Sequence, residues 1–126
     1  MRRATALAQL VEEARWLAEQ DRVLEARDTY LVAADGFEEL GTALGTVAAK
    51  RARLEAKRMH VVLWAREHVD PAVRSENVIT WRRPPFGMEA YAFLVQARCR
   101  QTSQVMPVTA TVLVRVEPDG RVIVLP

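Results

Sequence analysis

Two histidines, one cysteine and a few acidic pairs are the residues whose types could support catalysis or metal binding. His60 and His68 stand eight residues apart in a stretch of helical periodicity, twice the i, i+4 spacing at which two ligands on one helix hold a metal ion. No cysteine or carboxylate cluster completes a ligand set. We therefore predict no metal site and no cofactor. We interpret both histidines as boundary residues, His68 beside Glu67 and Asp70 where positive charge is favoured.

Nucleophilic and acid–base catalysis also find no support. Cys99 falls on the expected inner face of a strand, where a thiol is usually a packing group. Ser75 and Ser103 stand in expected turns without a neighbouring histidine, and the acidic pairs at 12–13 and 38–39 are typical of helix surfaces. The glycines read as turn and cap residues rather than as a phosphate loop. We predict no catalytic residue.

Length and composition favour one ordinary globular domain of 126 residues, with a helical part over residues 1–70 and a sheet part over 71–126. The chain has no run of about 18 apolar residues and no signal-peptide core at its start. Its single cysteine fits a reducing compartment. We expect a cytoplasmic protein that does not contact the membrane.

The net charge of +2 conceals opposite charges in the two halves, with a balance of −4 over residues 1–40 and +6 over 41–126. The densest basic stretch is 50–58, where Glu55 is the only acid. These cations could pair with the acidic helices of the same chain, or they could bind nucleic-acid phosphate with strong salt dependence. The basic residues are Lys50, Arg51, Arg53, Lys57 and Arg58.

Apolar spacing predicts two helices, at about 4–19 and 23–40, joined by a short turn and therefore packed as an antiparallel hairpin. Small residues at Ala14, Ala26 and Ala33 would allow a close approach. Trp16 lies off the apolar stripe and is a candidate interface anchor. The stripe of the second helix is Val23, Ala26, Tyr30, Ala33 and Phe37, widened by Leu24, Leu31 and Ala34.

This hairpin resembles a tetratricopeptide-type helical hairpin, or the related microtubule-interacting-and-trafficking three-helix module. The resemblance covers about the first forty residues, and its small positions stand twelve apart. The usual glycine is alanine here, the closing proline is absent, and no second repeat is visible. The resemblance implies a scaffold that holds a peptide or helix of another protein. Its positions are Leu10, Ala14, Leu17, Ala26, Tyr30 and Ala33.

A third, long helix is expected over 42–69, between Gly41 in a left-handed position and the stop at Pro71. Thr42 is a candidate N-cap, and Gly45 should make these first turns soft, by up to about 1 kcal/mol relative to alanine. The run from Val61 to Trp64 is apolar on every side and should be enclosed. The expected apolar stripe is Leu44, Val47, Ala48, Leu54, Val62, Ala65 and Val69.

The last third predicts an antiparallel meander of three or four strands, at about 78–82, 89–100, 108–117 and 121–125. The fold class is therefore α+β, with a helical hairpin and a long helix followed by the sheet. In architecture this order is similar to cystatin-like or nuclear-transport-factor-like folds, which host binding modules and enzymes alike. If a helix crosses a curved sheet, the side chains that could line a cavity, or fill a core, are Trp64, Tyr91, Phe93 and Val112.

Trp81 and the arginines of the sheet could form an aromatic and basic surface of the kind that binds single-stranded nucleic acid. Outward arginines on edge strands also discourage aggregation, which is the alternative interpretation. The leading hypothesis is a non-enzymatic interaction or assembly module, forming a homo-oligomer or binding another protein. Nucleic-acid binding and a small-ligand pocket are the rivals. The sheet arginines are Arg82, Arg83, Arg98, Arg100, Arg115 and Arg121.

Overall fold

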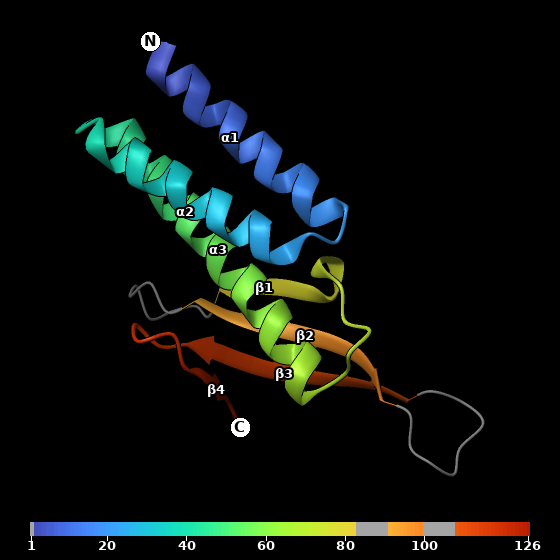
Figure 1. The fold of residues 1–126 in the computed structure, drawn as a ribbon. Helices are drawn as coiled ribbons and strands as arrows, with labels where there is room; N and C mark the ends of the chain where they lie inside the picture. Colours follow the sequence, from blue (N-terminus) through green and yellow to red (C-terminus); the bar gives the residue numbers. More distant parts are fainter. Residues whose placement is uncertain (1, 83–90, 100–107) are drawn as a thin grey trace. The chain divides into compact units, whose positions relative to one another are not determined.

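The computed structural model describes residues 2–82, 91–99 and 108–126 of the chain. It confirms the α+β class, with three long helices followed by a four-stranded antiparallel sheet (Figure 1). The chain forms two compact units, Met1–His60 and Val61–Pro126, and one long helix runs from the first into the second.

The first unit contains α1 (Arg2–Glu19), α2 (Val23–Glu39) and the first part of α3 (Ala43–His68). The turn between α1 and α2 has left-handed backbone at Asp21, with φ of 64°. Asp21 N donates to Ala18 O at 3.1 Å and Arg22 N donates to Leu17 O at 2.9 Å, the hydrogen bonds of a Schellman motif. This turn confirms the predicted hairpin, in which α1 and α2 run antiparallel (Figure 1).

Small side chains form the centre of the first unit, as the sequence predicts. Ala14, Ala26 and Ala33 have no exposed surface, and Tyr30 beside them is also buried. In the part of α3 that belongs to the first unit, however, the buried residues differ from the predicted stripe, whereas Val62 and Ala65 further along are buried as predicted. The buried residues of the first part are again mostly small, namely Gly45, Ala49, Ala52, Ala56 and Met59.

The predicted stripes were wrong at four large residues, which face outward instead. Leu24 and Leu31 were expected to widen the buried face of α2, and Leu44 and Val47 were expected to begin the buried face of α3. All four are exposed, and Leu44 retains 85% of its accessible surface. The physical reason is that rows of alanine and glycine already close the contacts between the helices, so the larger residues one step round each helix stay outside.

The start of α3 confirms two predicted roles. Gly41 has φ of 66°, and Thr42 Oγ1 accepts a hydrogen bond from Gly45 N at 3.0 Å, which is N-cap geometry. Gly45 has a further role that the sequence did not reveal. A Cβ atom at this position would lie 2.5 Å from the carbonyl oxygen of Phe37, so the glycine allows the end of α2 to approach α3. Gly36 is likewise inside α2 rather than in a turn or cap, facing the side chain of Leu7.

The second unit contains the end of α3, a 3-10 turn η1 (Ser75–Asn77) and strands β1 (Val78–Arg82), β2 (Tyr91–Cys99), β3 (Val108–Val116) and β4 (Val122–Val124). The strands follow one another in the order β1-β2-β3-β4, which confirms the predicted meander and leaves β1 and β4 at its edges. The predicted connections between the first and second strands and between the second and third strands lie outside the described residues.

One face of the sheet is core. Phe93 pairs with Val114 and Val95 pairs with Val78, and all four residues have 2% or less of their surface exposed. Of the apolar run 61–64 on α3, Val61 and Val62 are fully buried and Leu63 and Trp64 are half-buried. The predicted inner face of β2 is therefore correct at 93, 95 and 97, although Ala92 on the other face is buried as well.

Replacing Gly45 by alanine tests the close approach at the start of α3. In an open helix this change would stabilise by up to about 1 kcal/mol. Here we expect a net loss of about 1 to 3 kcal/mol, because the new methyl group meets a backbone carbonyl that cannot rotate away. Urea unfolding of Gly45→Ala and Gly36→Ala measures the difference. Gly36→Ala should lose less, since it meets the end of the Leu7 side chain. A Gly45→Ala protein as stable as the wild type would contradict this account.

Burial raises the pKa of Tyr30 above its ordinary value of 10.0, and the nearby Glu55 carboxylate raises it further. The folded state therefore keeps the neutral phenol at a pH where the unfolded chain has ionised it. The full contribution of Tyr30 to the free energy of unfolding is present below about pH 10, and this contribution decreases as the pH rises further. We expect the free energy of unfolding of wild type to fall more steeply above about pH 10 than that of Tyr30→Phe. Parallel pH profiles for the two proteins would refute it.

Candidate functional site

The contacts of His68 lie within α3. His68 stacks on Trp64, with ring centroids 5.2 Å apart, and its Nδ1 lies 3.0 Å from the Trp64 carbonyl oxygen. Within residues 2–82, 91–99 and 108–126, no three His, Cys, Asp or Glu side chains come together as metal ligands. The sequence predicted that His68 lies beside Glu67 and Asp70, whereas in the structure its ring contacts Trp64 within α3. The side chains of Cys99 and Ser103 lie outside the described residues.

Three of the four carboxylates in the acidic pairs of α1 and α2 bind arginines. Glu12 accepts a hydrogen bond from Arg15 Nη1 at 2.6 Å, Glu39 pairs with Arg3, and Glu38 pairs with Arg53. All of these carboxylates are exposed. Exposed ion pairs of this kind stabilise little individually. These carboxylates are therefore surface groups of the helical unit rather than members of a buried acid–base pair.

The basic stretch 50–58 is answered in part by the chain's own acids. Arg53 lies 3.4 Å from Asp35 and also contacts Glu38, so it links α3 to α2. The hydrogen bond to Glu38 is the main reason that the pKa of Arg53 is raised above its ordinary value. Arg58 Nε donates to Glu55 at 2.9 Å within α3. Arg53 therefore pairs with an acidic helix of the same chain, the first of the two interpretations in the sequence, whereas Arg58 pairs with the single acid of its own stretch.

Three other basic side chains of this stretch, Lys50, Arg51 and Lys57, are exposed. In the part of the chain that the structure describes, Arg51 and Lys57 have no acidic partner. Arg51 lies on the same side of α3 as the exposed Val47, whereas Lys57 lies on the flank that carries Arg53. The basic stretch is therefore divided between two sides of the helix.

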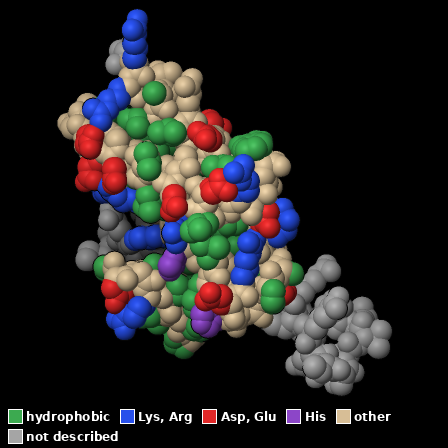
Figure 2. Space-filling model, in the orientation of Figure 1, with side chains coloured by type: hydrophobic (Ala, Val, Ile, Leu, Met, Phe, Trp, Pro, Cys, Tyr) green, Lys and Arg blue, Asp and Glu red, His purple; other side chains and the backbone are tan. Residues whose placement is uncertain are grey.

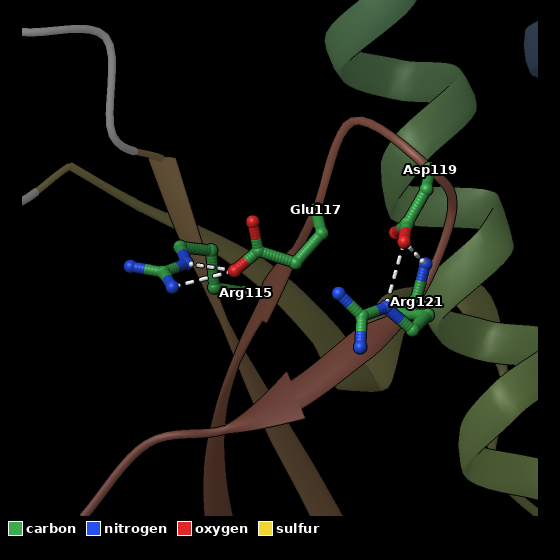
Figure 3. A network of polar contacts seen from close by, with 4 residues as sticks. All are labelled: Arg115, Glu117, Asp119 and Arg121. Carbon is green, nitrogen blue, oxygen red and sulfur yellow. Dashed lines mark hydrogen bonds and ion pairs between the residues drawn. The ribbon is translucent and has the colours of Figure 1, made fainter.

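The hairpin between β3 and β4 pairs its charges internally. Arg115 Nη2 donates to Glu117 Oε1 at 2.5 Å, and Arg121 Nε donates to Asp119 Oδ2 at 2.7 Å (Figure 3). Gly120 closes the turn with φ of 90° and donates its N–H to Glu117 O, which confirms the predicted turn at 118–120. Both described arginines of this hairpin carry an acid at hydrogen-bonding distance, which lowers the positive charge that they present.

The outer face of the sheet carries Trp81 and Arg115, as predicted. Ile79 pairs with Leu94, and Leu94 pairs with Leu113, which sets Trp81 and Arg115 on that same face. Trp81 retains 47% of its surface. The predicted surface also includes side chains that lie outside the described residues, those of Arg82, Arg83, Arg98 and Arg100.

The residues predicted to line a pocket are distributed differently. Phe93 is core, and Val112 lies on the same buried face of the sheet because it pairs with Val95. Trp64 is half-buried and is occupied by its contact with His68. The side chain of Tyr91 lies outside the described residues. Phe93 and Val112 thus belong to the packing of the sheet.

Large apolar side chains on the surface are the feature that the structure adds. Trp16 is 52% exposed, which agrees with its place off the predicted stripe. Figure 2 shows apolar patches between charged groups over the face in view. The exposure of Leu44 and Val47 could have been recognised from the row of small residues on α3, because that row marks a different buried face from the one that the large residues suggest. The exposed large apolar residues are Trp16, Leu24, Leu31, Val32, Leu44, Val47, Ile79, Trp81 and Val124.

No described helix is long and apolar enough to cross a membrane. No protein-family model, curated protein or solved structure matches the chain.

Two neighbouring arginines of α3 should respond differently to neutralisation. Arg53→Met removes contacts to two carboxylates and should destabilise by about 0.5 to 1 kcal/mol, with a smaller loss at high salt. Arg51→Met removes an exposed side chain without a described acidic partner and should change stability by less than about 0.5 kcal/mol. Urea unfolding at low and high salt measures both. Equal losses for the two variants would argue against the ion pairs of Arg53.

Proposed function

We propose that this protein is a non-enzymatic interaction or assembly module that forms a homo-oligomer. The observation that carries this proposal is the exposure of large apolar side chains on the helices of the first unit. Six of the nine such residues in the described part of the chain, including Leu24 and Val47, lie there. Burying apolar surface stabilises by roughly 25 cal/mol per Å², and surfaces of this kind mark sites of association.

The chemistry of the described surface supports a binding role over catalysis. Carboxylates of the described surface, such as Glu12, Glu38 and Glu39, bind arginines, and the pKa values of Tyr30 and Arg53 are raised above their ordinary values. Neither shift belongs to a group poised for proton transfer, since one reflects burial of a phenol and the other an exposed ion pair. Apolar residues placed between acids and bases are the composition from which specific protein contacts are built.

Molecular mass in solution tests the proposal directly. A monomer has a mass of 14.2 kDa. Light scattering and sedimentation equilibrium across the micromolar range should give a larger mass that increases with concentration. A monomeric mass at every concentration would overturn the homo-oligomer.

Two apolar variants locate the association. Leu44→Gln changes the most exposed apolar side chain of the first unit and should weaken association about tenfold. Val124→Gln is the matched control, because it changes an exposed apolar residue of the second unit. Its mass distribution should equal that of wild type. Weaker association of Val124→Gln with unchanged association of Leu44→Gln would instead place the interface on the sheet.

A further inference from the structure

An exposed stripe along α2 alternates leucine with aspartate. Leu24, Asp28, Leu31 and Asp35 follow one another at spacings of four, three and four residues. This is the spacing of successive d and a positions in a heptad seam. The leucines are 51% and 42% exposed, and both aspartates are exposed. The stripe is therefore a helix face with apolar d positions and acidic a positions that its own unit leaves uncovered.

A second stripe, along α3, has the same spacing and the opposite charge. Val47, Arg51, Leu54 and Arg58 each stand 23 positions after their counterparts on α2. Val47 is 48% exposed, Arg51 is exposed, and Leu54 is half-buried. Apolar residues thus fall opposite apolar residues, and arginines fall opposite aspartates, when the two stripes are aligned in parallel.

One chain cannot make this parallel contact with itself. Within the first unit α2 and α3 run antiparallel, because Gly45 lies beside Phe37 at one end while Glu55 lies near Tyr30 towards the other. Their contact uses the alanine rows and the ion pairs of Arg53. A partner that aligns in parallel with either stripe must come from outside the chain.

We propose that α2 of one copy packs in parallel against α3 of a second copy, an inference that rests on the proposed homo-oligomer. The layers would be Leu24 with Val47, Asp28 with Arg51, and Leu31 with Leu54. Asp35 and Arg58 form the next layer. Within its own chain, Asp35 pairs with Arg53, Arg58 pairs with Glu55, and Asp28 pairs with the adjacent Arg27 at 3.2 Å. A charged pair at an a position fixes the register of such a contact.

Charge excludes the symmetric alternatives. Pairing α2 with α2 in parallel would set Asp28 against Asp28, and pairing α3 with α3 would set Arg51 against Arg51. The contact therefore joins two different surfaces, α2 of one copy and α3 of the other. Each copy offers one surface of each kind.

Charge reversal at the middle layer tests the inference. Asp28→Arg and Arg51→Asp should each weaken self-association at least tenfold, because each sets like charges together. The double variant Asp28→Arg/Arg51→Asp should regain most of the wild-type association. An equimolar mixture of the two single variants should also regain association, since every contact between unlike variants pairs opposite charges and only contacts between like variants repel. Sedimentation velocity measures all four samples.

Lys57→Glu is the matched control, because it reverses an exposed charge on the other flank of α3. Its association should match that of wild type, and circular dichroism melts should show that every variant is folded. Wild-type oligomers that resist both single reversals would overturn this contact and leave the proposed function standing. Weakening by both reversals without recovery in the double variant would also overturn it. A monomeric wild type would end both proposals.

Discussion

Close contact between small side chains is the constraint on which the helical unit depends. Ala14, Ala26 and Ala33 have no exposed surface, and α3 contributes a row that includes Ala49 and Ala52. Helices that meet through alanine and glycine approach closely, and backbone atoms then supply much of the packing. Gly45 is the extreme case, since its missing side chain is the space occupied by a carbonyl oxygen of α2. This packing leaves little room at the interface for leucine.

The consequence is a core and a surface that differ from what hydropathy alone indicates. Leucine and valine are the residues from which an apolar stripe is usually drawn, and that procedure assigned Leu44 and Val47 to the core. Because the alanine row lies on another side of α3, the larger residues are outside. The sequence predicted the elements well for the reason that periodicity, caps and turn residues are local. Gly41, Thr42 and the turn at 118–120 all act within a few residues of where they stand.

What could not be predicted depends on contacts between elements. The partners of Arg53 come from α2, fifteen and eighteen positions earlier, and no local pattern distinguishes Arg53 from Arg51. Trp64 is a different case, because its ring meets His68 one turn later in the same helix, whereas the sequence suggested that it lines a cavity or fills a core. Trp16 and Trp81 were correctly placed on the surface because each one's periodic position could be read from its own helix or strand.

The opposite charges of the two halves acquire a more specific meaning from these placements. Some of the charge is used within the chain, as in the pairs that Arg53 and Arg58 make. The charges are also not spread evenly, because Asp28 lies between two exposed leucines and Arg51 lies between Val47 and Leu54. An exposed charge alone contributes little to stability or affinity, but a charge flanked by apolar residues becomes desolvated when the apolar residues are covered. A desolvated charge disfavours any partner that lacks the opposite charge at that position. In the proposed contact, the two stripes would therefore combine a modest attraction with a strict choice of register.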